Sequence, residues 1–123
     1  MYRGLRPEHV DGPRVLLEAV DAQGTSVVRA KYGTPADALM KAKGGTAVAA
    51  ITGANFPPPM TSDGGIEWEW FPLDAPEEGD DTHAECRLRH TSERPSTDNR
   101  KPKSGSFKER LRKALADRFR VLS

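Results

Sequence analysis

Two short segments near the beginning of the chain alternate between apolar and polar positions. They cover residues 14–20 and 26–32, and the residues between them include Gly24, which can take the positive φ of a tight turn. Period-two alternation places the apolar side chains of each segment on one face, as in a half-buried strand. The pattern therefore predicts a β-hairpin over residues 14–32.

A short helix is predicted to follow, over residues 35–43. Thr34 can cap its first turn, Pro35 suits the first helical position, and a pair of glycines ends the segment. The large apolar side chains of this helix are Leu39 and Met40. We expect both of them to pack against the core.

Three further segments have the composition of strands. Residues 46–52 form a short apolar run bounded by glycines, which is typical of a buried strand. Residues 66–71 alternate strictly, with Trp68 and Trp70 on one face, and residues 82–91 alternate again. Antiparallel pairing of the last two segments predicts a second hairpin, with the acidic residues between them in its loop.

The outer face of this second hairpin carries opposite charges on its two strands. Antiparallel pairing places Arg87 and Arg89 on one strand against Glu67 and Glu69 on the other. Each such cross-strand pair contributes about 0.2–1 kcal/mol to stability. Cys86 then lies on the inner face, where we expect it to behave as a small buried apolar residue.

The last third of the chain has a different composition. Residues 92–105 are rich in Ser, Pro, Lys and Arg and contain no aliphatic or aromatic side chain, so we expect a flexible basic linker. Beyond it, Ser106 is a candidate N-cap, and large apolar residues recur at helical spacing. An amphipathic helix is therefore predicted for residues 106–123, with an apolar stripe of Phe107, Leu111, Leu115, Phe119 and Leu122.

Together these elements predict an α+β fold. We expect a small antiparallel sheet in the order ββαβββ with one packed helix, followed by the flexible basic linker and the C-terminal amphipathic helix. Because the predicted strand over residues 46–52 has few large side chains, the core is thin, and we expect the sheet to need the terminal helix, or a second copy of the chain in a homodimer, as its other layer. The expected units are an N-terminal extension (1–11), a small α+β domain (12–91), the linker (92–105) and the helix (106–123).

Charge is distributed in blocks along the chain, although the net charge is only +1. Residues 1–73, 74–85 and 86–123 carry net charges of about −1, −6 and +8. Blocks of one sign are typical of interaction surfaces. The candidate basic surface comprises Arg87, Arg89, Arg100, Lys101, Lys103, Lys108, Arg110, Arg112, Lys113 and Arg120, and the candidate acidic surface comprises Glu67, Glu69, Asp74, Glu77, Glu78, Asp80 and Asp81.

The basic surface favours a regulatory accessory protein that binds nucleic acid, or a nucleic-acid-bound complex, by neutralising phosphates with its C-terminal segment. No catalytic fingerprint is present, so we expect a non-enzymatic protein without a cofactor. One alternative is an inhibitor or adaptor that presents the acidic surface and the C-terminal helix to a protein partner. The other alternative is a small metal-dependent hydrolase that uses His9, Asp11, Asp21 and Asp63.

The segment HAECRLRH contains three residues of metal-binding types, His83, Cys86 and His90. On a strand, His83 points away from the other two, so we expect no metal site there. The chain also lacks an apolar run long enough to span a bilayer and an apolar N-terminal signal sequence. We therefore expect a cytoplasmic protein with no membrane partner.

Overall fold

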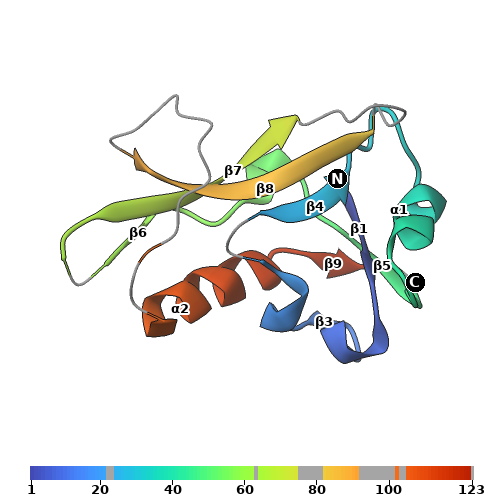
Figure 1. Ribbon diagram of the computed structural model, residues 1–123, viewed down its shortest axis with the longest axis horizontal. Coiled ribbons are helices and arrows are strands. Elements are labelled where there is room, and N and C mark those ends of the chain that lie inside the picture. Colours follow the sequence, from blue (N-terminus) through green and yellow to red (C-terminus); the bar gives the residue numbers. More distant parts are fainter. Residues whose placement is uncertain (22–23, 63, 75–81, 92–101, 103–104, 123) are drawn as a thin grey trace.

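The computed structural model of the protein describes residues 1–21, 24–62, 64–74, 82–91, 102 and 105–122. Most of its strands form one curled, antiparallel sheet in which strands far apart in the sequence are neighbours (Figure 1). The strands of this sheet are β1 (Tyr2–Leu5), β4 (Thr25–Val28), β5 (Ala47–Ala50), β6 (Met60–Thr61), β7 (Glu67–Asp74), β8 (His83–His90) and β9 (Arg120–Val121), and their order across it is β6-β7-β8-β4-β1-β5-β9.

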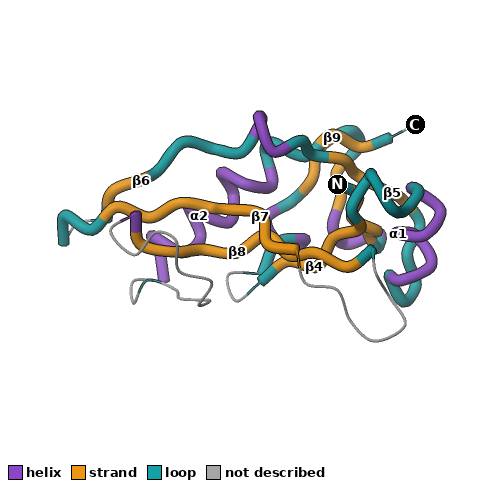
Figure 2. The backbone as a smooth tube through the Cα atoms, turned by 90° about the horizontal axis from the view of Figure 1, so that it is seen from above, coloured by secondary structure: helices purple, strands orange, loops and turns teal. Residues whose placement is uncertain are grey.

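Helices and a second small sheet complete the described part of the fold. The helices are α1 (Pro35–Lys41), α2 (Gly105–Ala116) and the 3-10 helices η1 (Pro7–His9), η2 (Leu17–Ala19) and η3 (Gly53–Asn55). The second sheet pairs β2 (Val10–Asp11) with β3 (Arg14–Val15). The architecture is α+β, with β6 at one end of the molecule and β5, β9 and α1 at the other (Figures 1 and 2). None of the helices in the described residues is long and apolar enough to cross a membrane.

Helix α2 packs on one face of the main sheet, which we call the α2 face. Its buried residues Phe107, Leu111 and Leu115 share a core cluster with Trp68 and Trp70 of β7. The indole Nε1 of Trp70 donates a buried hydrogen bond of 2.8 Å to the main-chain oxygen of Leu111, which fixes the helix across the strand. The second layer of the sheet is therefore supplied by the same chain.

Helix α1 covers the opposite face, which we call the α1 face, at the end formed by β1 and β5. Ala38 of this helix packs with Val28 and Val48 in a second, smaller cluster. The helix lies very close to β1, because a Cβ atom added at Gly4 would overlap the main-chain oxygen of Ala38. Small residues on both elements therefore permit this close approach.

The predicted pairing of the two long strands is confirmed. β7 and β8 are antiparallel, with Trp70 opposite Leu88 on the α2 face and Glu69 opposite Arg89 on the α1 face. The Arg89 guanidinium donates to Oε1 of Glu69 at 2.8 Å. β7 also continues beyond the predicted segment, as far as Asp74.

The second predicted cross-strand ion pair does not form. Arg87 lies opposite Phe71, and its guanidinium binds the carboxylate of Glu85, two residues away on the same strand, at 3.1 Å. Glu67 lies opposite Thr61 of β6. The register of the hairpin therefore brings together one of the two pairs expected from charge alternation.

The predicted hairpin over residues 14–32 is wrong. Residues 14–20 divide into β3 and the 3-10 helix η2, and β3 pairs with β2 instead of β4. Strand β4 lies between β8 and β1. Val15, Ala19 and Val20 all join the core cluster on the α2 face. The 3-10 turn thus directs the adjacent residues Ala19 and Val20 to the same side, which the alternation of a strand would not allow.

The first residues of the chain are not an extension, in contrast to the prediction for residues 1–11. β1 lies inside the sheet, between β4 and β5, and pairs with β5 along its whole length. The strand order along the chain therefore differs from the predicted ββαβββ. Only four residues form β1, and Arg3 and Gly4 interrupt its apolar alternation, so the strand has little signal in the sequence.

Helix α1 begins where it was predicted, after its cap residue Thr34. The Thr34 N–H donates to Oδ2 of Asp37 at 2.8 Å, and the Asp37 N–H donates to Oγ1 of Thr34 at 3.3 Å. The predicted core contacts are wrong, since Met40 is 84% exposed and Leu39 is 37% exposed. Ala38 faces the sheet instead, because the close approach of β1 leaves no room for a longer side chain.

The C-terminal helix is shorter than predicted. It ends at Ala116, and β9 then pairs antiparallel with β5, with Val121 opposite Ala49. Phe119 belongs to the core cluster although it follows the helix, and Leu122 packs on the α1 face. The apolar spacing that resembled one continuous helix therefore covers the helix, the turn that contains Phe119, and Leu122, which follows β9.

Candidate functional site

The predicted basic surface does not form one patch among the described residues. Arg87 and Arg89 lie on the α1 face of β8, where they bind Glu85 and Glu69 at 3.1 and 2.8 Å. The Arg89 guanidinium also lies over the ring of Phe71, with 4.2 Å between its Cζ and the ring centroid. Both arginines are thus held by neighbouring carboxylates, which reduces the charge they offer to a phosphate.

The cations of α2 include one that is structural. The Arg112 guanidinium donates to the main-chain oxygens of Val20 and Leu17 at 2.7 and 3.2 Å, which anchors η2 against the helix. Lys113 pairs with Asp117, one helical turn away, at 3.1 Å. Arg112 therefore stabilises the packing of η2 on the helix, and Lys113 stabilises the end of the helix, so both side chains already have a structural role.

The solvent-exposed side of α2 carries both signs of charge. Glu109 and Asp117 are exposed, as are Arg110 and Lys113, and Lys108 is half-buried at the edge of this surface. Mixed charges are typical of a solvated helix surface, whereas phosphate binding favours an excess of cations. The helix alone is therefore a weak anion-binding element.

The acidic surface is also largely neutralised where it is described. Asp74 pairs with Arg29 at 3.1 Å, Glu69 pairs with Arg89 at 2.8 Å, and Glu67 is exposed. The predicted site residues that lie outside the described residues are Arg100, Lys101, Lys103, Glu77, Glu78, Asp80 and Asp81.

A surface groove of about 450 Å³ beside β9 contains two arginines of the C-terminal segment. Arg118 and Arg120 line it together with Thr52 and Asn55. The Asn55 side-chain amide donates to the main-chain oxygen of Arg118 at 3.3 Å, and the Arg118 guanidinium donates to Oδ1 of Asn55 at 3.4 Å. None of the described residues that line the groove is acidic. The groove is therefore a positively charged concavity.

Sequence analysis included only Arg120 of this groove among the candidate site residues. Arg118 and Asn55 are 63 positions apart, and the segment that carries the arginines was predicted to be helical. A turn after α2 and the pairing of β9 with β5 bring them together. No local pattern in the sequence indicates that contact.

The candidate metal ligands of β8 are separated by the sheet. His83 lies on the α1 face, whereas Cys86 is fully buried in the core cluster of the α2 face. Burial raises the pKa of the Cys86 thiol from its usual 9.0 to about 12, so the thiol remains neutral near pH 7. No group of three or more His, Cys, Asp or Glu side chains in the described part of the chain is placed to hold a metal ion.

His9, a member of the hydrolase alternative, has a structural role. Its side chain is buried, and its Nδ1 accepts a hydrogen bond of 3.1 Å from the Arg6 N–H. Burial lowers the pKa of His9, and the nearby charges of Arg6 and Arg3 lower it further. Asp63 of the same alternative lies outside the described residues.

Comparisons of the chain with protein-family models, with curated proteins and with solved structures found no match. The groove beside β9 has a defined chemical preference. It combines the guanidinium groups of Arg118 and Arg120 with a side-chain amide, and its described lining includes no carboxylate. That combination suits an anionic partner.

Proposed function

We propose that this protein is a non-enzymatic accessory protein that binds nucleic acid, free or within a complex, through the groove beside β9. The observation that carries the proposal is the pair Arg118 and Arg120 in a concave surface without a carboxylate among its described lining residues. Guanidinium groups bind phosphate oxygens in two-point geometry, and phosphate neutralisation releases counterions. The groove thus provides a binding site for a phosphate backbone, and this binding does not depend on the base sequence.

The packing of α2 supports binding by charge in preference to apolar docking. The apolar stripe of this helix, Phe107, Leu111 and Leu115, is buried in the protein's own core. An amphipathic helix that docks into a partner needs such a stripe on the surface. The C-terminal segment therefore contributes arginines to the partner surface, while its apolar side chains stabilise the fold.

An inhibitor or adaptor that acts through the acidic surface has less support from the described residues. Glu69 and Asp74 are already paired with Arg89 and Arg29. A partner's basic groove would have to displace these arginines before it could use the two carboxylates. Binding to a basic protein without binding to nucleic acid would favour this alternative.

Salt-dependent binding to a fluorescent DNA duplex tests the proposed function. We expect the double variant R118Q/R120Q to bind more weakly and to lower the slope of log affinity against log salt by about 0.9 for each phosphate that is no longer neutralised. The matched control R110Q/K113Q removes the same charge from the mixed-charge surface of α2. We expect the control to leave the slope nearly unchanged.

Two results would contradict the proposal. Equal losses of DNA affinity in the two double variants would mean that binding depends on the net charge of the protein and not on the groove. The proposal would also be excluded if the unsubstituted protein bound neither the duplex nor a single strand at low salt, because binding to the phosphate backbone would then be absent.

A further inference from the structure

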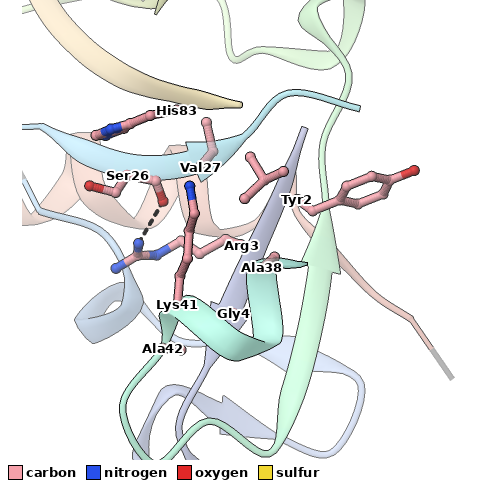
Figure 3. Close-up of a pocket in the computed structure, with 10 residues that line it drawn as sticks. Tyr2, Arg3, Gly4, Ser26, Val27, Ala38, Lys41, Ala42 and His83 are labelled. Atoms are coloured by element: carbon pink, nitrogen blue, oxygen red, sulfur yellow. Dashed lines mark hydrogen bonds between the residues drawn. The ribbon is translucent and has the colours of Figure 1, made fainter. Parts of the chain in front are cut away.

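Another cavity, of about 340 Å³, opens on the α1 face between helix α1 and strands β1 and β4 (Figure 3). Its polar lining residues are Tyr2 and Arg3 of β1, Ser26 of β4, Lys41 of α1 and His83 of β8. Valine and alanine side chains complete the wall. Sites for small organic ligands have volumes of about 300–1,000 Å³ and the same combination of apolar walls and a few polar groups.

The cavity exists because β1 and β4 diverge. The two strands pair where Tyr2 lies opposite Val28, and β1 then runs steeply across the direction of β4 (Figure 1). The Arg3 side chain bridges the gap between them. Its Nη1 donates to the main-chain oxygen of Ser26 at 2.7 Å, and its Nε donates to the main-chain oxygen of Ala19 at 2.7 Å.

Arg3 is a half-buried cation that forms no direct ion pair with a described carboxylate, although the charge of Asp21 acts on it from farther away. Both of its hydrogen bonds go to main-chain oxygens, and its Nη2 donates to no described residue. Burial lowers the pKa of Arg3, although a guanidinium remains charged at all physiological pH values. Removing a cation from water without a directly paired counter-charge costs free energy, which a bound anion offsets.

Two further groups complete a polar lining around the cavity. The Lys41 side chain rises from α1 toward β4, beside Ser26, and its Nζ donates to Oγ1 of Thr82 at 3.1 Å (Figure 3). The His83 ring lies beyond Ser26, on the neighbouring strand β8 (Figure 3). No described residue that lines the cavity is acidic. The charged side chains among the described lining residues, Arg3 and Lys41, are therefore both cations.

We propose that this cavity binds the phosphate or carboxylate group of a small organic anion. Arg3 and Lys41 supply the positive charge, and the Ser26 hydroxyl and the His83 ring are the neighbouring hydrogen-bonding groups. The aliphatic wall of valine and alanine side chains contacts the organic part of the ligand. Neither the location of this site, on the α1 face, nor its residues overlap the groove beside β9.

Phenyl phosphate, benzoate and benzyl alcohol are suitable probes, because they share a ring and differ in the attached group. We expect phenyl phosphate, benzoate or both to bind with a Kd on the order of 1 mM or lower, and benzyl alcohol to bind far more weakly. In an amide NMR titration, we expect the saturable shifts to include Gly4, Ser26 and Lys41. The stronger of the two anions identifies the preferred group.

The variant K41Q and its matched control K43Q test the cation of α1. Both lysines are exposed at the end of the helix, but only Lys41 lines the cavity. We expect K41Q to weaken binding of the preferred anion about fivefold, as for loss of an exposed ion pair, and K43Q to bind like the unsubstituted protein. Because both side chains are exposed, neither variant is expected to disturb the fold.

Three results would overturn the proposal. They are equal affinities for benzyl alcohol and the two anions, equal losses in K41Q and K43Q, and shifts confined to residues around Arg118 and Arg120. The variant R118Q/R120Q separates this site from the proposed nucleic-acid groove, since we expect it to bind phenyl phosphate and benzoate unchanged. Loss of DNA binding therefore leaves the cavity proposal intact, and the reverse is also true.

Discussion

The two faces of the main sheet are built from different interactions. On the α2 face, large side chains such as Trp70, Leu88 and Leu111 pack together and are almost completely excluded from solvent. On the α1 face, the contacts are ion pairs, such as Glu69 with Arg89, or a small cluster of valines and an alanine. Since apolar burial dominates folding stability, the α2 face carries most of it, and a polar cavity is tolerated on the other face.

The largest effect is expected from a truncated side chain on the α2 face. Leu111 is 1% exposed, and replacing it with Ala leaves a cavity between α2 and β7. We expect Leu111→Ala to lower the free energy of unfolding by about 2–5 kcal/mol. Chemical denaturation followed by tryptophan fluorescence measures this change, because Trp70 contacts the same residue.

The matched control is Met40→Ala on helix α1. This side chain is also long and apolar, but it is 84% exposed. We expect its removal to change the free energy of unfolding by less than about 0.5 kcal/mol. Similar losses in the two variants would mean that the two faces do not differ in the way the burial indicates.

A smaller effect is expected where α1 meets β1. In Gly4→Ala, the new Cβ overlaps the main-chain oxygen of Ala38, so the helix has to move away from the strand. We expect a loss of about 1–3 kcal/mol, as for overpacking in a core. Amide shifts should concentrate in α1 and β1, with β7 and β8 nearly unchanged.

Gly53→Ala is the control for this substitution. A Cβ at Gly53 would have no atom within 4 Å, so the stability should change by less than about 0.5 kcal/mol. A Gly4→Ala protein as stable as this control would show that α1 does not rest directly on β1.

The last effect concerns ionisation on the α2 face and arises only at alkaline pH. Burial raises the pKa of Cys86 from 9.0 to about 12, so the unfolded thiol loses its proton at a lower pH than the folded one. Stability is therefore lost as the pH rises through this interval, by up to about 1.4 kcal/mol for each pH unit. Below pH 9 this contribution is fully present.

The difference in free energy of unfolding between the unsubstituted protein and Cys86→Ala isolates this contribution. Other alkaline titrations occur in both proteins and cancel. We expect the stability advantage of the unsubstituted protein to shrink between about pH 9 and pH 10.5. A difference that is independent of pH would mean that the Cys86 thiol ionises equally in the folded and unfolded states.

Local patterns in the sequence were sufficient to predict part of this fold. The alternation around Trp70 predicted β7 and its pairing with β8, because a period of two is specific to strands that are half-buried. The start of α1 was predictable since Thr34 caps its own helix through Asp37, three residues away. In each case the residues that determine the structure are close together in the sequence or repeat regularly.

The remaining elements and both proposed sites depend on contacts between distant residues. β9 has two residues, and its position is determined by pairing with β5. Arg3 has no distinctive sequence context, yet it reaches Ala19 and Ser26 because β1 inserts beside β4. Arg118 meets Asn55 for a similar reason. Such contacts are set by tertiary structure, which period and composition do not encode.

The position of β5 between β1 and β9 has a consequence for the order of folding. This part of the sheet joins strands from the first residues, the middle and the last described residues of the chain. Closing such long loops is entropically costly and slows folding. During synthesis, β5 cannot be covered on its outer side until Arg120 and Val121 have left the ribosome. Until then its unpaired backbone is an edge to which another nascent chain can add a strand.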